Sequence, residues 1–189
     1  LGVVYEQGSG NVQQDVKKAM SLYEKACDQN FTSACYNLGV FYVEGKSVKQ
    51  DLAKGRSLYE KACMDDDDIA CNNLGLLYAN GAGVTQDYKK ASELYTKACK
   101  SDNLYACNNL GFLHAEGRGV AQDYKKASEY YQKACDGKLG MGCDNLGLLY
   151  ASGQGVMKDY KKASSFYEAA CNNNYERGCN NLGILYAEG

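Results

Sequence analysis

Apolar residues recur at helical spacing along the chain, and the stretch between residues 70 and 99 shows the pattern clearly. From Ala70 to Ala79, apolar side chains follow the i, i+4, i+7 spacing of one helix face: Ala70, Cys71, Leu74, Leu77 and Tyr78. Residues 81–84 then include two glycines, which tolerate the left-handed backbone that often ends a helix. The pattern therefore predicts a first helix that ends before Gly81.

A second helix is predicted directly after this loop. Asp87 is a favourable N-cap residue. The apolar residues that follow share one helix face: Tyr88, Ala91, Leu94, Tyr95, Ala98 and Cys99. Charged residues occupy the opposite face, namely Lys89, Lys90, Glu93 and Lys97. Because residues 101–103 then turn into the next first helix, the unit is a helical hairpin followed by a short turn.

This unit repeats along the chain with a period of 36 residues. The Leu-Gly pairs that begin at Leu38, Leu74, Leu110, Leu146 and Leu182 keep that register. A fixed period of this size is typical of a repeat array, whose hairpins bury their apolar faces by stacking. We therefore predict an all-α fold, an α/α superhelical solenoid that forms a single domain over residues 1–189. It has about five repeats, and both ends are expected to be cut within a repeat.

The ten cysteines form five pairs, each with seven residues between its members: Cys27 and Cys35, Cys63 and Cys71, Cys99 and Cys107, Cys135 and Cys143, Cys171 and Cys179. The spacings typical of zinc sites and of redox motifs are absent, which favours structural disulfides. Bridges across each short turn are favoured, and bridges between cysteines 28 apart, such as Cys71 and Cys99, are the competing geometry. Disulfides imply an oxidising compartment, so we expect a secreted or periplasmic protein.

Composition and charge narrow the classes of partner. The net charge is −2 and the lysines are spread evenly, which argues against nucleic acid. No apolar run reaches membrane-spanning length. The only histidine, His114, stands where other repeats have tyrosine, and it is expected to fill the same packing position. We predict neither a metal nor a cofactor.

The run that includes Leu74-Gly75 and Asp87-Tyr88-Lys89-Lys90-Ala91 resembles the Sel1-like repeat, a relative of the tetratricopeptide repeat. Together with the paired cysteines, it resembles the Helicobacter cysteine-rich protein family. The resemblance covers the whole chain and implies right-handed stacking, disulfides within each cysteine pair, and secretion. It also implies penicillin binding with weak β-lactamase activity.

The residues that such an activity needs are missing from the sequence. No serine has a lysine three positions later, and there is no Lys-Thr-Gly. A zinc hydrolase would need several histidines, but the chain has one. No catalytic residue is therefore predicted, and a weak β-lactamase is kept only as the alternative function.

One polar position recurs, just before each Leu-Gly pair: Asn37, Asn73, Asn109, Asn145 and Asn181. These asparagines either form a structural ladder between repeats or line a concave groove, where amides can bind the backbone of an extended peptide. In the tetratricopeptide repeat the matching residue points into the groove, and we favour that function. The apolar residues two positions after each Leu are expected to be core or groove floor: Val3, Val40, Leu76, Phe112, Leu148 and Ile184. The residues just before the asparagines differ between repeats, and we expect them to form the rim of the groove and to set its specificity: Tyr36, Asn72, Asn108, Asp144 and Asn180.

The sequence thus predicts a secreted repeat scaffold that binds a protein or peptide partner. The partners considered are a host protein and, for the alternative function, a β-lactam or peptidoglycan-related ligand.

Overall fold

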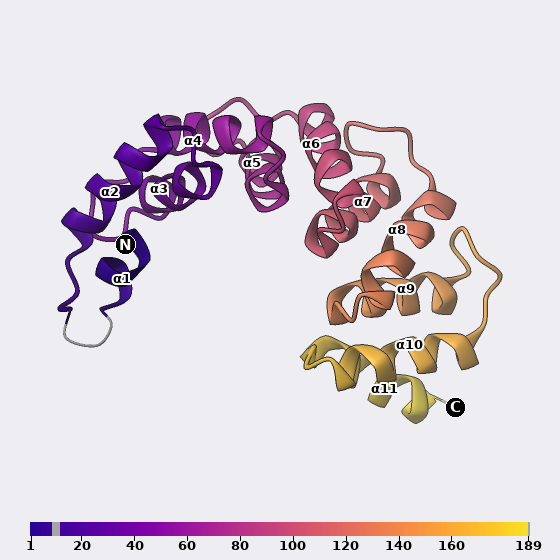
Figure 1. Cartoon of the computed structure of the whole chain (residues 1–189). Coiled ribbons are helices and arrows are strands. Elements are labelled where there is room, and N and C mark those ends of the chain that lie inside the picture. The colour runs from indigo at the N-terminus through magenta and orange to yellow at the C-terminus, as the bar shows by residue number, and fades with distance from the viewer. Residues whose placement is uncertain (9–11, 189) are drawn as a thin grey trace. The chain divides into compact units, whose positions relative to one another are not determined.

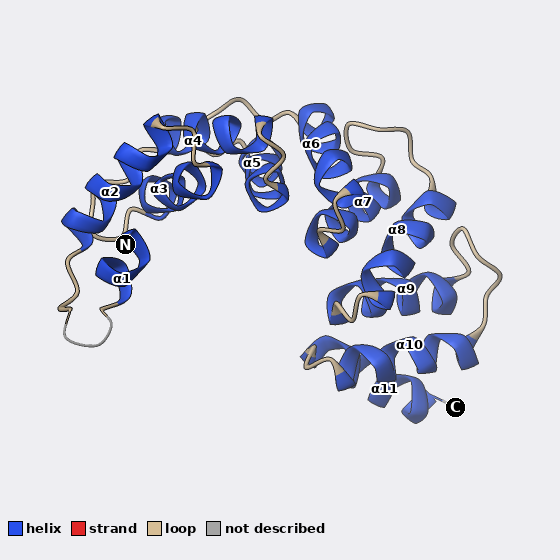
Figure 2. Ribbon diagram, in the orientation of Figure 1, coloured by secondary structure: helices blue, strands red, loops and turns tan. Residues whose placement is uncertain are grey.

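Figure 1 shows the computed structural model of the chain, which describes residues 1–8 and 12–188. These residues form eleven helices and no strand (Figure 2). The first helices of the hairpins are α1 (Gly2–Gln7), α3 (Thr32–Glu44), α5 (Asp68–Asn80), α7 (Leu104–Glu116), α9 (Gly140–Ser152) and α11 (Glu176–Glu188). The second helices are α2 (Val16–Asp28), α4 (Leu52–Met64), α6 (Tyr88–Lys100), α8 (Tyr124–Asp136) and α10 (Tyr160–Asn172). The predicted all-α solenoid of helical hairpins is confirmed.

The chain divides into two compact units, Leu1–Asp87 and Tyr88–Gly189, and each is described by itself. The single domain over residues 1–189 stays a prediction. Within the described residues, none of the helices is both long enough and apolar enough to cross a membrane.

The ends of the helices follow the residues that predicted them. First helices end at glycines with a left-handed backbone, with φ values of 68°, 68°, 67° and 75° at Gly45, Gly81, Gly117 and Gly153. Second helices begin after an aspartate whose carboxylate accepts a hydrogen bond from the backbone N–H three residues later, as at Asp15, Asp51, Asp123 and Asp159. Each such cap satisfies a backbone donor that the helix itself leaves unpaired.

Four hairpins close around a tyrosine from the second helix and a glycine from the first. Tyr59 and Tyr131 are buried. A β-carbon added to Gly39 would lie 2.7 Å from the ring of Tyr59, and one added to Gly111 would lie 2.8 Å from the ring of Tyr131. The glycines of the Leu-Gly pairs at Gly39, Gly111 and Gly147 are therefore needed because a larger residue would displace the tyrosine ring.

Five disulfides join each second helix to the first helix that follows it. They link the cysteines of each sequence pair, with Cα–Cα distances between 4.5 and 4.7 Å. Links 28 residues apart do not occur, and the described cysteines include no free thiol. Two lysines add a second connection between repeats, because the ammonium of Lys61 donates to the carbonyl of Cys27 at 2.6 Å and that of Lys133 donates to Cys99 at 2.8 Å.

Candidate binding face

The first and second helices differ in the charge that they carry. The chain has 18 lysines, which are its 21 basic residues less Arg56, Arg118 and Arg177. Every one of these lysines lies on a second helix or in a loop, and no first helix contains one. The first helices instead expose large apolar side chains. The two kinds of helix thus give the repeat two chemically different surfaces.

We call the exposed side of the first helices the first-helix face. In the unit 1–87 it includes Asn37, Val40, Ile69, Asn73 and Leu76. In the unit 88–189 it includes Tyr105, Asn109, Phe112, Met141, Asn145, Leu148, Arg177, Asn181 and Ile184.

All five asparagines of the recurring position are half-buried on this face. Three of them donate a hydrogen bond to the first helix of the preceding repeat. The Nδ2 of Asn145 donates to Oδ1 of Asn108 at 2.9 Å, and that of Asn181 donates to Oδ1 of Asp144 at 2.8 Å. In the other unit, Nδ2 of Asn73 lies 3.4 Å from the hydroxyl of Tyr36. These contacts form a ladder between repeats and still leave part of each side chain exposed.

The residues before these asparagines do not form the predicted rim. Asn72, Asn108 and Asp144 are 7%, 4% and 0% exposed, so this expectation is wrong at three of its five positions. In an α-helix, neighbouring residues are rotated by about 100°, so the residue before a half-exposed asparagine lies on a different side of the helix. At Asn108 and Asp144 that side faces the next first helix, which the side chains of both residues contact.

Asp144 is a fully buried carboxylate, and its partners lie on α11. The guanidinium of Arg177 donates from Nε to Oδ2 of Asp144 at 2.5 Å and from Nη2 to Oδ1 of Asn145 at 2.7 Å. Burial alone would lower the pKa of Arg177, but the hydrogen bond and the charge of Asp144 raise the pKa above its usual range. The buried carboxylate of Asp144 is thus paired with a cation and hydrogen-bonded, as a buried charge requires.

In the unit 88–189, an exposed apolar row runs beside the asparagines, in which Phe112, Leu148 and Ile184 are 42%, 41% and 51% exposed. In the unit 1–87, Leu76 at the same repeat position is 37% exposed. These positions are therefore surface rather than core. Tyr105 adds a second exposed ring on α7. The guanidinium of Arg118 lies 5.3 Å from the ring centre of Phe112. It also contacts Glu116 at 3.7 Å and donates a hydrogen bond to the hydroxyl of Tyr88 at 3.2 Å.

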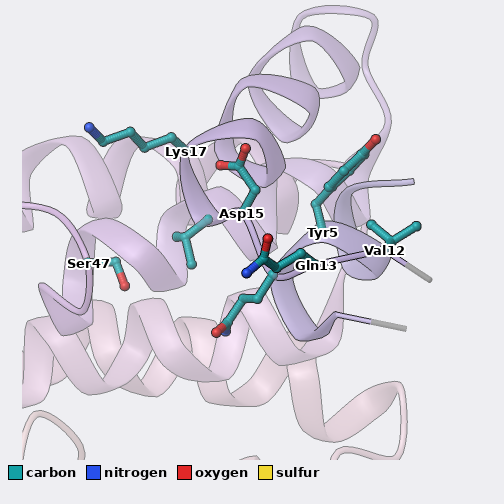
Figure 3. Close-up of a pocket in the computed structure, with 8 residues that line it drawn as sticks. Tyr5, Val12, Gln13, Asp15, Lys17 and Ser47 are labelled. Atoms are coloured by element: carbon teal, nitrogen blue, oxygen red, sulfur yellow. The ribbon is translucent and has the colours of Figure 1, made fainter. Parts of the chain in front are cut away.

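A hollow of about 530 Å³ lies between the start of α2 and the loop that contains Ser47 (Figure 3). Its polar side chains do not converge on one point, because Lys17 and Tyr5 extend in different directions. Asp15 is occupied in capping α2, and the amide of Gln14 donates to the carbonyl of Glu6 at 2.8 Å. The polar residues that line the hollow therefore serve to begin α2, and they are not arranged as a catalytic site.

The remaining candidate chemistry is structural. His114 is half-buried and stacks on Tyr130, with 5.6 Å between ring centres, so it fills the predicted tyrosine position. In the part of the chain that the structure describes, no group of three or more His, Cys, Asp or Glu could hold a metal ion. In the acidic run 65–68, Asp67 caps α5 by accepting a hydrogen bond from the N–H of Ala70 at 2.7 Å.

Two contacts on this face were not predicted from the sequence. The Asp144–Arg177 pair joins residues 33 apart, and Arg118 packs against Phe112 from the following loop. The sequence nevertheless marks both contacts. Arg118 and Arg177 are two of the chain's three arginines, and Asp144 stands where neighbouring repeats have asparagine.

Five consecutive segments match the Sel1 repeat: residues 1–31, 32–67, 68–103, 104–139 and 140–175. The chain therefore belongs to the Sel1 repeat family, whose scaffolds generally serve protein–protein interaction. The comparison with curated proteins finds no match.

Solved structures share this fold. One is c5321, a protective antigen present in uropathogenic Escherichia coli strains, with a TM-score of 0.91 and 32% identity over 97% of this chain and 39% of that one. A Sel1 repeat protein from Oxalobacter formigenes has a TM-score of 0.90 and 33% identity over 98% of this chain and 76% of that one. Helicobacter pylori cysteine rich protein B has a TM-score of 0.51 and 34% identity over 68% of this chain and 92% of that one. The chain thus spans 39% of the length of the E. coli antigen.

Proposed function

We propose that this chain is a secreted or periplasmic scaffold that binds a protein or peptide partner through its first-helix face. Asn37, Asn73, Asn109, Asn145 and Asn181 form part of the contact surface, beside the exposed apolar row.

The observation that carries this proposal is the absence of lysine from every first helix, together with the apolar side chains exposed there. The centres of protein interfaces are depleted of lysine and enriched in aromatic residues and arginine. In the unit 88–189 the face carries Tyr105, Phe112 and Arg177 in this way. The lysines on the second helices fit the solvated side of the scaffold.

The proposed compartment rests on the five disulfides. Such bridges persist in oxidising environments and are rare in the cytosol. A periplasmic or secreted location supplies that environment and would give the face access to envelope or extracellular proteins.

Site-specific photo-cross-linking tests which surface binds. A photoreactive phenylalanine analogue is placed at Phe112 or Leu148 on the face and, as matched controls, at Lys125 or Lys161 on the second helices. The proposal expects the same partner band from both face positions and none from the controls in cells that make the protein. Cross-links from the control positions alone would refute it.

A further inference from the structure

The turn between α2 and α3 contains a sequence found nowhere else in the chain. Asn30-Phe31-Thr32 is the one place where any of the fifteen asparagines is followed two residues later by serine or threonine. Asparagine, a residue other than proline, and then serine or threonine form the acceptor sequence for N-linked glycosylation of secreted proteins. Three residues also match by chance, so it is the structure of this turn that makes it a candidate site.

The asparagine of this sequence is open to solvent. Asp28 is the last residue of α2 and Thr32 is the first residue of α3, and the side chains from 28 to 31 are all exposed. Within the described residues, the side-chain amide of Asn30 has no hydrogen-bond partner. Its nitrogen can therefore carry a substituent without the loss of a contact that the fold uses.

Backbone conformation accounts for an asparagine at residue 30. Its φ is 62°, in the left-handed region that asparagine and aspartate tolerate better than most residues. The counterparts in the later repeats have φ values between 59° and 66°: Asp66, Asp102, Lys138 and Asn174. The residues on either side of Asn30 are therefore what set this turn apart from the others.

Neither Thr32 nor Asp28 has a role in the fold of the turn. The later repeats have unrelated residues at the position of Thr32: Asp68, Leu104, Gly140 and Glu176. The Thr32 hydroxyl and the Asp28 carboxylate form no hydrogen bond or ion pair within the described residues. Asp28 also places a negative charge at the C-terminal end of α2, where the helix dipole disfavours it by about 0.3–1 kcal/mol. A free acid before the asparagine and a free hydroxyl after it are thus available to another protein.

From these observations we infer that Asn30 is the acceptor of an N-linked glycan and that a transferase recognises Asp28, Asn30 and Thr32 together. The donor is an oligosaccharide carried on a polyprenyl pyrophosphate. The amide nitrogen of Asn30 bonds to the anomeric carbon of the sugar, and the bond between that carbon and the pyrophosphate oxygen breaks. The polyprenyl pyrophosphate leaves with the bonding electron pair, and the amide gives up one proton to water. The inference goes beyond the proposed function and rests only on the compartment proposed there.

The bridge between Cys27 and Cys35 sets the time at which the transfer occurs. It encloses Asn30 and holds the two Cα atoms 4.7 Å apart. The N–H groups of Asn30 and Phe31 donate to backbone carbonyls of α2, each at 3.0 Å. A transferase that grips the chain on both sides of Asn30 has to open this turn, which the bridge opposes. Transfer therefore precedes closure of the bridge.

The first test is peptide mapping by mass spectrometry of the whole protein isolated from the cells that make it. The peptide that contains Asn30 should carry the mass of an oligosaccharide. In parallel, the chain is exported to the periplasm of a bacterium supplied with an oligosaccharyltransferase and its polyprenyl-linked donor, beside a reference acceptor protein that shows the transferase to be active.

Variants of the exported chain test each residue of the acceptor. Asn30→Asp should abolish the modification and keep the fold, because two later repeats have aspartate at this position. Thr32→Val should also abolish it, with an unchanged melting temperature by circular dichroism. Asp28→Asn should slow the transfer about tenfold, as expected for the loss of one contact with a charged group. Cys27→Ala/Cys35→Ala should raise the modified fraction, because the turn then stays open.

The last turn provides a matched control. Glu176→Thr places a threonine two residues after Asn174, whose φ of 59° matches that of Asn30, but Asn172 stands in the place of Asp28. We expect this variant to gain little or no second glycan. A second glycan as abundant as the first would refute the role of Asp28.

Two results would refute the inference as a whole. One is an unmodified Asn30 in the protein from its own cells, or in the periplasm where the reference acceptor is glycosylated. The other is equal modification of Thr32→Val and the unchanged chain. The proposed function is judged independently, because cross-links from Phe112 and Leu148 report the partner whether or not Asn30 carries a sugar.

Discussion

The loops after α5, α7 and α9 touch the second helix of the preceding repeat, and Gly119 makes the closest of these approaches. Its φ is 69°, and a β-carbon added there would lie 2.3 Å from the carbonyl carbon of Tyr88 and 2.5 Å from the amide nitrogen of Lys89. Gly117, two residues earlier, has nearly the same φ, 67°, but its added β-carbon would lie no closer than 3.1 Å to the side chain and 3.4 Å to the backbone nitrogen of Gln122 in the same loop. The two glycines thus share a positive φ and differ in their contact with the preceding repeat.

Replacement of each glycine by alanine separates these two effects. A left-handed backbone costs an L-residue about 1–2 kcal/mol, and both variants bear this cost. Gly119→Ala also forces the loop away from backbone atoms of Tyr88 and Lys89. Overpacking of this kind adds about 1–3 kcal/mol. In a chain of this size, that additional loss corresponds to a melting temperature roughly 2–12 °C below that of Gly117→Ala.

The assay is thermal and urea unfolding of both variants beside the unchanged chain, followed by circular dichroism at 222 nm. Two denaturants are needed because repeat arrays can depart from two-state unfolding. Hydrogen exchange at the start of α6 should also increase in Gly119→Ala and stay unchanged in Gly117→Ala. Equal losses of stability in the two variants would refute the argument that the contact with Tyr88, rather than the backbone conformation, makes glycine necessary at residue 119.

Four further outcomes are expected. Asn145→Ala should lower the free energy of unfolding by about 1–3 kcal/mol, measured in urea, because Oδ1 of Asn108 and Nη2 of Arg177 lose the hydrogen bonds that they form with Asn145; an unchanged stability would show that the ladder is not structural. Removal of one bridge by Cys99→Ala/Cys107→Ala should cost about 2–3 kcal/mol for a loop of this length, and peptide mapping of the unreduced chain should recover the five bridges between sequence neighbours. Burial raises the pKa values of Tyr59, Tyr95 and Tyr131 above 10. Their contribution to stability is therefore complete below about pH 10 and is lost as the pH rises further, and absorbance at 295 nm should show these rings ionising only as the chain unfolds. Purified protein should turn over a chromogenic β-lactam far below the usual range of about 1–1000 per second, since Ser-x-x-Lys is missing; turnover that co-purifies through several columns would contradict this.

The features of the fold that repeat every 36 residues could be predicted from the sequence. Gly81 and Gly117 end their helices where the apolar pattern stops, and Asp51 and Asp123 cap the helices that follow. Each of these signals acts over only a few residues, and the repetition shows it several times. The cysteine pairs are equally local, which is why their spacing alone favours the correct partners.

Burial within the candidate face could not be predicted in the same way. Asn108 and Asp144 are covered by the next first helix, which lies more than 30 residues further along the chain. The 36-residue period places the equivalent residues of all repeats on the same side of their helices. It does not determine how deeply the next repeat buries them. The pairing of Asp144 with Arg177 depends on that depth, and it occurs at a position where neighbouring repeats have other residues.

The disulfide arrangement also has a consequence for the order in which the bridges form. Each cysteine is eight residues from its partner, whereas the next cysteine in the other direction is 28 residues away, as from Cys35 to Cys63. Loop closure in an unfolded chain favours the shorter link by about 1 kcal/mol, or roughly sixfold. A chain that enters an oxidising solution from its N-terminus therefore meets each correct partner before any wrong one, so oxidation in the order of synthesis leads directly to the native set of bridges.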